Sequence, residues 1–241
     1  PDTVTEIGDE AFADCAALKE LFLTEKVNAG WDETIGCTGH SVFARCTALT
    51  EVSLPMRQVP DSLFADCTAL KTVLFEKGVE ETWNAVFAGC TALENVVLSD
   101  TVRKIADGTF MGCTALREID IPDSVTEIGF IDPYGVFQGC TALERVRLSA
   151  NLETVGRCTF EGCTALKEMA LPDAVRWIHW EAFSGCTALR RVSIPGTVAE
   201  IEPGAFDDCP NLTVEIRRKK PLLFPGKWYK GMKKCRLEWK G

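Results

Sequence analysis

Nine of the 12 cysteines recur at one position of an internal repeat, and thiols are the side chains of this sequence best suited to chemistry. Zinc would need four ligands that converge on one point, and a disulfide would need two facing Cβ atoms about 3.8 Å apart. A column of parallel side chains, one per repeat, meets neither requirement. We therefore predict that the nine cysteines act as small buried hydrophobic residues and stay reduced. They are Cys15, Cys46, Cys67, Cys90, Cys113, Cys140, Cys163, Cys186 and Cys209.

The other three cysteines lie outside this column; we consider them for reactivity but favour an ordinary surface or half-buried thiol over a reactive one. Cys158 replaces a usually polar position, and Cys37 falls in an insertion of the repeat, so we expect both to be accessible. Cys235 lies near the C-terminus. His40 follows Cys37 by three residues, which would suit half of a metal site or a nucleophile pair, but the chain has only two histidines. We therefore predict a solvent loop here, with no catalytic residue and no metal.

The repeat itself has a dominant period of 23 residues. Apolar residues at the sixth and eighth positions after the cysteine, such as Val96 and Leu98, predict one short half-buried strand per repeat. A turn and a second apolar pair then bring the chain back, so that stacked coils share one core. A phenylalanine precedes each cysteine by three residues, at Phe12, Phe43, Phe64, Phe87, Phe110, Phe137, Phe160, Phe183 and Phe206. A leucine follows each by three, at Leu18, Leu49, Leu70, Leu93, Leu116, Leu143, Leu166, Leu189 and Leu212.

Two stretches, CTALREIDIPDSVTEIGF (Cys113 to Phe130) and PDTVTEIGDEAFADCAAL (Pro1 to Leu18), resemble the BspA-type leucine-rich repeat. The resemblance implies an α/β-type leucine-rich repeat solenoid of about nine rungs over residues 1–216. It implies a parallel β-sheet on the concave face and short irregular, 3-10 or β segments on the convex side. It also implies a protein-binding or adhesion surface at the cell surface or outside the cell. Reduced core cysteines equally allow an intracellular or organellar location.

The outward side chains of the predicted strands are candidates for contacting a protein partner. Several outward positions of the early repeats are apolar, and some of the later repeats carry arginines there, a mixture expected at protein interfaces. Ordinary strand variation with charge pairing between neighbouring strands explains the same pattern equally well. The candidate residues are Phe22, Leu74, Val97, Arg145, Arg147 and Arg191.

Two departures from the repeat fall on the return side of the coil. The insertion GFIDPYGVF (Gly129 to Phe137) adds about four residues, including Tyr134, and we expect it to widen one edge of the solenoid. The stretch RWIHWEAF (Arg176 to Phe183) contains Trp177 and Trp180. We predict that these two rings pack against the neighbouring rung.

Residues 217–241 form a basic, aromatic segment after an acidic body. They hold ten basic side chains and one acidic one, a net charge of +9, so the other 216 residues carry −18 of the total of −9. We expect this segment to cap the open end of the solenoid. It would also suit an anionic surface or an acidic protein, whereas nucleic acid is not expected, because the acidic body would repel it. Its candidate residues are Lys227, Trp228, Tyr229, Lys230, Lys233, Lys234 and Trp239.

The sequence contains no P-loop, no nucleophile elbow and no zinc-protease motif. We therefore predict a non-enzymatic scaffold, without a cofactor, that binds a protein partner through its concave face. The alternative is a structural or linker subunit, docked into a larger complex or onto an anionic or membrane surface through residues 217–241. No apolar run reaches about 18 residues, so no transmembrane segment is predicted. The chain begins in the middle of a repeat, from which we expect a processed or truncated product.

Overall fold

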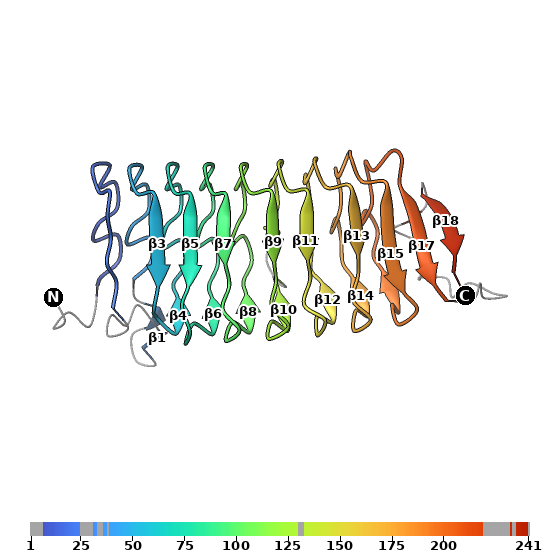
Figure 1. Ribbon diagram of the computed structural model, residues 1–241, viewed down its shortest axis with the longest axis horizontal. Coiled ribbons are helices and arrows are strands. Elements are labelled where there is room, and N and C mark those ends of the chain that lie inside the picture. The colour runs from blue at the N-terminus through green and yellow to red at the C-terminus, as the bar shows by residue number, and fades with distance from the viewer. Residues whose placement is uncertain are drawn as a thin grey trace.

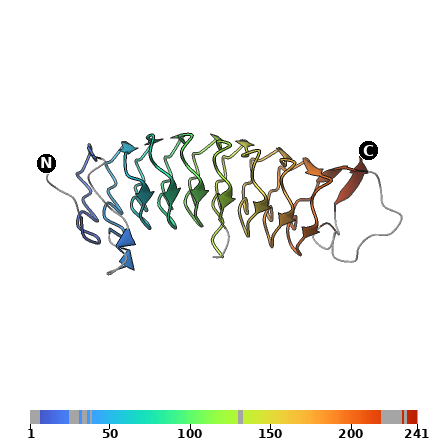
Figure 2. The same ribbon diagram turned by 90° about the horizontal axis from the view of Figure 1, so that it is seen from below.

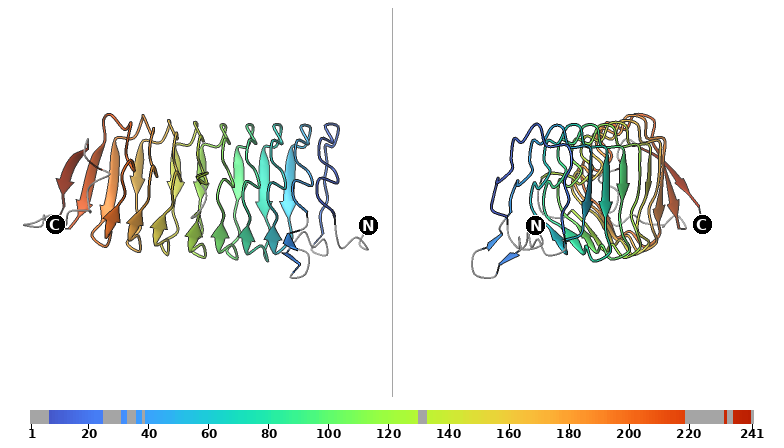
Figure 3. Two further views of the ribbon diagram at one scale, coloured as in Figure 1. Left: turned by 180° about the vertical axis from the view of Figure 1, so that it is seen from behind. Right: turned by 60° about the vertical axis from the view of Figure 1, so that its left-hand side comes forward.

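The structure, a computed structural model, describes residues 7–24, 31–32, 36–37, 39–129, 133–218, 232 and 235–240, with only the backbone of 31–32 and 36–37. Successive repeats form coils that stack in one row from the N-terminal to the C-terminal end (Figure 1). This arrangement confirms the predicted leucine-rich-repeat solenoid. Seen from behind, each coil returns across the opposite side before the next begins (Figure 3, left).

One face of the solenoid, here called the long-strand face, carries one strand of three to five residues from each repeat after the first. Its strands are β3 (Glu51–Leu54), β5 (Thr72–Phe75), β7 (Asn95–Val97), β9 (Glu118–Asp120), β11 (Arg145–Arg147), β13 (Glu168–Ala170), β15 (Arg191–Pro195) and β17 (Thr213–Arg217), followed by β18 (Arg236–Trp239). All pairs among these strands are parallel. Within each strand, apolar side chains that point inward alternate with exposed ones, as period-two patterning requires.

The opposite side, here called the return face, carries two-residue strands, as Figure 2 shows along the lower edge of the coils. These strands are β4 (Gln58–Val59), β6 (Glu81–Thr82), β8 (Lys104–Ile105), β10 (Glu127–Ile128), β12 (Thr154–Val155), β14 (Trp177–Ile178) and β16 (Glu200–Ile201). They also pair in parallel. An antiparallel pair, β1 (Trp31–Asp32) and β2 (Gly36–Cys37), lies in the first insertion.

The predicted count of about nine rungs was slightly high. Seven turns, from β3 with β4 to β15 with β16, carry a strand on both faces. The first repeat has no strand assigned within residues 7–24, and its Phe12 is 44% exposed because no described rung covers it. Of the segments expected on the return side, β-strands are the ones formed, and the described residues include no α-helix.

A continuous stack of phenylalanine rings runs through the core. The nine predicted rings, from Phe12 to Phe206, stack on one another with centroids 5.2 to 5.7 Å apart and nearly parallel planes. The seven rings from Phe64 to Phe206 are buried, as are the leucines of the repeat from Leu49 onward. Because each rung makes the same contacts with its neighbours, the core is one column rather than a globular centre.

Gly135 lies where the return-face insertion rejoins the stack, and it allows two backbones to approach closely. A Cβ atom at this position would lie 1.7 Å from the carbonyl oxygen of Cys158 in the next rung. We predict that Gly135→Ala lowers the free energy of unfolding by about 3 kcal/mol, because backbone must move to make room. Urea unfolding followed by circular dichroism measures this loss. Gly8→Ala is the control, since nothing lies within 4 Å of the added Cβ; equal stabilities of the two variants would contradict the tight approach.

Candidate binding surface

The backbone ladder of the long-strand face is divided into three sheets. They contain β3, β5 and β7, then β9 and β11, and then β13, β15, β17 and β18. Val96 and Val146 occupy the inward position of β7 and β11, beside the two divisions, and both are partly exposed. The inward residues of β3, β5, β9, β13 and β15 are buried. The divisions are therefore the places where apolar core is accessible from this face.

The three apolar candidates are all exposed, but only two of them meet. Leu74 of β5 lies directly opposite Val97 of β7, and their side chains are 41% and 53% exposed. Ser53 lies opposite Leu74 on the other side. Phe22, which is 87% exposed, belongs to the first repeat and is separated from Leu74 by the rung of Ser53. The structure thus places a two-residue apolar patch, Leu74 and Val97, next to the first division.

The three arginine candidates are paired with carboxylates. Arg145 lies directly opposite Glu118 and forms an ion pair with it. Arg147 contacts Asp123 at 3.2 Å. Arg191 lies 3.4 Å from Glu215 and 3.9 Å from Glu168. The charge-pairing explanation of these arginines is therefore realised, and each exposed pair adds at most about 1 kcal/mol to stability.

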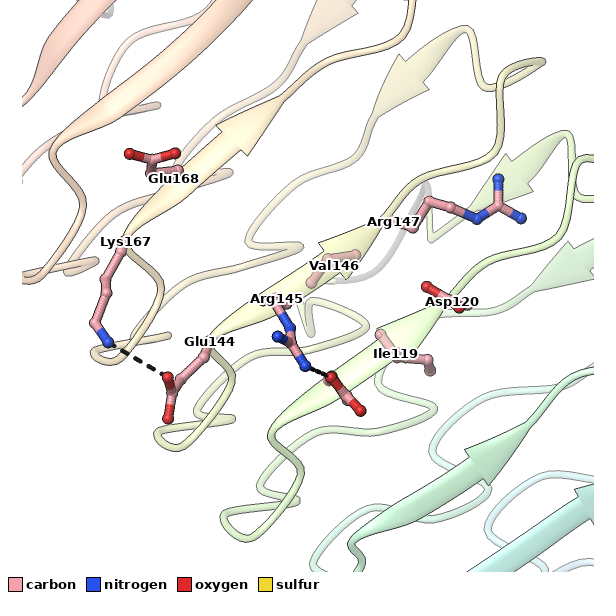
Figure 4. A pocket seen from close by; sticks show the side chains of 9 residues that line it. Ile119, Asp120, Glu144, Arg145, Val146, Arg147, Lys167 and Glu168 are labelled. Atoms are coloured by element: carbon pink, nitrogen blue, oxygen red, sulfur yellow. Dashed lines mark hydrogen bonds and ion pairs between the residues drawn. The ribbon is translucent and has the colours of Figure 1, made fainter.

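A shallow open depression of about 500 Å³ lies over the second division, between β9, β11 and β13 (Figure 4). Charged side chains of both signs surround Val146, including Arg145 and the pair formed by Lys167 and Glu144 at 3.3 Å. Apart from Asp120, the charged side chains that line the depression already have ion-pair partners among the described residues, so a protein partner would mostly have to exchange ion pairs. The depression suits the polar rim of an interface better than its centre.

The described part of the C-terminal segment extends the solenoid. Strand β18 pairs in parallel with β17, with Leu237 opposite Val214 and Trp239 opposite Ile216. Trp239 is only partly exposed, and the guanidinium of Arg218 lies 6.0 Å from its ring centroid. The sequence analysis missed this strand, although the signal was present: Met232 follows Cys209 by one full period and is buried like the cysteines.

Most of the basic candidates are not part of this strand. Lys227, Trp228, Tyr229, Lys230, Lys233 and Lys234 lie outside the described residues. Two basic residues of the segment that are described, Arg236 and Lys240, contact Glu238 at 3.7 and 3.3 Å.

The cysteine column is buried as predicted from Cys46 to Cys209, and it also forms a hydrogen-bonded ladder that the sequence analysis missed. Each thiol from Cys46 onward donates a hydrogen bond to the carbonyl oxygen of the phenylalanine in the preceding rung, at 3.1 to 3.3 Å. Burial raises the pKa of Cys67, Cys140 and Cys209 to about 12. These thiols stay protonated at neutral pH, so they are poor nucleophiles and poor metal ligands.

Cys158 was expected to be accessible, and this expectation was wrong. Its side chain is 2% exposed and donates to a carboxylate oxygen of Glu181 at 3.6 Å. Burial, together with Glu161 and Glu181, raises its pKa to about 12. Ligand atoms of these three residues lie within 4.8 Å of one another, and within the described residues they are the one group with the composition to hold a metal. Glu161 also accepts a hydrogen bond from Gln138 at 2.8 Å, and three ligands with a protonated thiol make an incomplete coordination shell.

The other two thiols outside the column differ from Cys158. Cys235 is partly exposed, and burial raises its pKa to about 11. The side chain of Cys37 lies outside the described residues, so the predicted loop site with His40 is described only on the histidine side, where His40 lies 3.5 Å from Asp61.

The return-face tryptophans, predicted to pack against the neighbouring rung, both leave a large part of their side chains exposed. Trp177 is 40% exposed and Trp180 is 50% exposed, because both occupy outward positions of the coil. His179 between them is partly buried and lies 2.9 Å from Glu202.

A stack of coils with a period of about 23 residues, a parallel strand from each coil on one face and a recurrent buried leucine belongs to the class of leucine-rich repeat solenoids. Residues 1–30, 37–131 and 130–220 match the BspA type leucine rich repeat region, in six copies. The chain belongs to this family. Its architecture is typical of protein-interaction scaffolds, and leucine-rich repeats are generally non-enzymatic.

The first two of the following solved structures share the fold. A leucine-rich repeat protein from Bacteroides ovatus is 26% identical, with a TM-score of 0.50 over 100% of this chain and 76% of its own. One from Eubacterium ventriosum is 21% identical, with a TM-score of 0.51 over 95% and 79%. A leucine rich cell surface protein from Faecalibacterium prausnitzii is 23% identical, with a TM-score of 0.42 over 92% and 78%. The comparison with curated proteins found no match. Among the described residues, no helix has the length and apolar character needed to cross a bilayer.

Proposed function

We propose that the protein is a non-enzymatic scaffold that binds a protein partner through the long-strand face. The observation that carries this proposal is the apolar patch of Leu74 and Val97, two opposed and exposed side chains at the edge of a divided sheet. The next strand, β9, presents the exposed carboxylates of Glu118 and Asp120. An apolar centre with a charged rim is the usual composition of a protein interface.

The support for the patch is rigid, which favours binding without reordering. Leu74 lies between Val73 and Phe75, which are buried in the central column, and Val97 lies between Val96 and Leu98, which are partly buried and pack against the same core. A patch held by a stacked core loses little conformational entropy when a partner covers it.

The double variant Leu74→Glu/Val97→Glu tests the proposal. We expect it to weaken capture of the partner from native extract by about tenfold or more, because two charges would be buried in the centre of the interface. Cross-linking mass spectrometry of the captured complex identifies the contact site. Trp177→Glu/Trp180→Glu is the matched control, since it adds the same charges at exposed apolar positions of the return face.

A third variant separates the alternative function. Lys227→Glu/Lys230→Glu reverses charge in the C-terminal segment without altering β18. If this variant alone releases the partner, and release also follows from raised salt, the protein is a subunit docked through residues 217–241 and the proposal for the long-strand face fails.

A further inference from the structure

The return face has a division of its own, at the insertion. Strands β4, β6, β8 and β10 form one sheet, and β12, β14 and β16 form another. In the sequence, the insertion between Gly129 and Gly135 falls between β10 and β12, and the described chain beside it projects beyond the other rungs (Figure 2). A depression of about 460 Å³ lies over the division, lined by Thr126 to Gly129 on one side and by Asn151, Glu153 and Thr154 on the other.

Three exposed aromatic side chains lie on the rungs around this depression, although none of them lines it. Trp177 lies directly opposite Thr154 in the pairing of β14 with β12. Trp180 follows in the same rung, and its carbonyl oxygen accepts a hydrogen bond from the backbone N–H of Cys158 at 3.0 Å. Tyr134, which is 55% exposed, holds the repeat position of Trp180 two rungs earlier, so the two backbone positions lie about 10 Å apart along the solenoid.

The charges around the rings exclude a ligand of strong charge. Arg157 is exposed and holds the same repeat position in the rung between those of Tyr134 and Trp180. Its positive charge would repel a cationic ligand. Glu153 is exposed on one side of the depression, and Glu127, which is exposed on the other side, lies 3.9 Å from Lys104; the carboxylate of Glu153, which has no ion pair among the described residues, opposes an anion. An uncharged ligand with many hydroxyl groups is repelled neither by the arginine nor by the carboxylates. Carboxylates accept, and guanidinium groups donate, pairs of hydrogen bonds to neighbouring hydroxyls.

We propose that this face is a carbohydrate site that binds a neutral oligosaccharide across Tyr134, Trp177 and Trp180. The apolar face of a sugar ring stacks on an exposed indole or phenol ring and buries area there, while the ring hydroxyls remain at its edge for polar groups. Trp177 and Trp180 provide two stacking surfaces in one rung, and Tyr134 provides a third across the division. Glu153 and Arg157 then bond the hydroxyls. The site is separate from the long-strand face, so a scaffold can hold a glycan and a protein partner together.

Isothermal titration calorimetry with defined hexasaccharides tests this proposal. The probes are cellohexaose, xylohexaose, mannohexaose and chitohexaose, with a heparin hexasaccharide as the anionic comparison. We expect at least one neutral probe to bind and to quench tryptophan fluorescence. Trp177→Ala and Trp180→Ala should each weaken that binding by roughly tenfold, and Trp177→Phe, which keeps a ring, should retain most of it.

Controls separate loss of the site from loss of the fold. Phe22→Ala removes an exposed ring in the first repeat and should leave binding unchanged, as should Leu74→Glu/Val97→Glu. Thermal melting by circular dichroism should show that both tryptophan variants remain folded. The proposal is overturned if no neutral hexasaccharide binds, if the heparin hexasaccharide binds more tightly than every neutral one, or if the folded tryptophan variants bind like the wild type.

Discussion

The protein should unfold in mild alkali, at about pH 9.5 to 10, because the cysteine column must stay protonated to remain folded. An unfolded thiol has a pKa of about 8.5, whereas burial raises the pKa of Cys67, Cys140 and Cys209 to about 12. A group whose pKa is raised by folding contributes stability that is complete below the unfolded pKa and is lost as the pH rises toward the folded one. The loss is about 1.4 kcal/mol per thiol for each pH unit above 8.5.

The number of thiols makes this effect large. Seven cysteines of the column have a raised pKa and 6% exposure or less in the middle and C-terminal rungs: Cys67, Cys90, Cys113, Cys140, Cys163, Cys186 and Cys209. One pH unit above 8.5, they together remove about 10 kcal/mol, which is comparable to the whole stability of an ordinary domain.

Urea unfolding at a series of pH values, under reducing conditions, measures the loss as a slope. The matched variant is Cys113→Ser/Cys140→Ser, in which a hydroxyl can still donate to the phenylalanine carbonyl but does not titrate in this range. We expect this variant to be less stable at pH 7. Above pH 8.5 its free energy of unfolding should fall less steeply with pH, with a slope that corresponds to about two fewer protons released on unfolding. An unchanged slope in this variant would show that lysine and tyrosine residues, rather than the column, govern the alkaline unfolding.

Removal of one ring from the middle of the phenylalanine stack should have the second largest effect. Phe110 is fully buried, and its ring centroid lies 5.7 Å from that of Phe87 and 5.5 Å from that of Phe137. We expect Phe110→Ala to lower the free energy of unfolding by about 4 kcal/mol, because it leaves a cavity between two rungs that are held apart by their backbones. Chemical denaturation followed by tryptophan fluorescence gives the value.

The end of the same stack provides the control. Among the described residues Phe12 stacks only on Phe43, and it is 44% exposed, so Phe12→Ala should lower the free energy of unfolding by only about 1 kcal/mol. In a solenoid each rung contacts only its neighbours, so Phe110→Ala should also split unfolding into separate N-terminal and C-terminal transitions. Hydrogen exchange resolves the two halves. If both variants lost the same free energy of unfolding and Phe110→Ala still unfolded in one cooperative transition, the phenylalanine column would not be the stabilising unit.

The sequence by itself determined the repeat, the coil of each repeat and the burial of its columns. This was possible because every rung repeats the environment of the one before it. A residue that recurs every 23 positions, such as the cysteine, therefore lies next to the equivalent residues of the adjacent rungs. Its spacing in the sequence is enough to predict these neighbours. The thiol ladder was missed because the hydrogen bond depends on where the phenylalanine carbonyl points, which no residue type reports.

Only the tertiary structure decided what the outward side chains do. The repeat constrains the inward columns, but outward positions vary freely, so their partners depend on which side chains the stacking places in adjacent rungs. The stacking of the rungs places the three arginines beside carboxylates. It also places Leu74 opposite Val97, whereas Phe22 lies apart from them. It buried Cys158 against Glu181 and exposed Trp177 and Trp180. The return face is divided between β10 and β12, and no single residue of the sequence predicts this division.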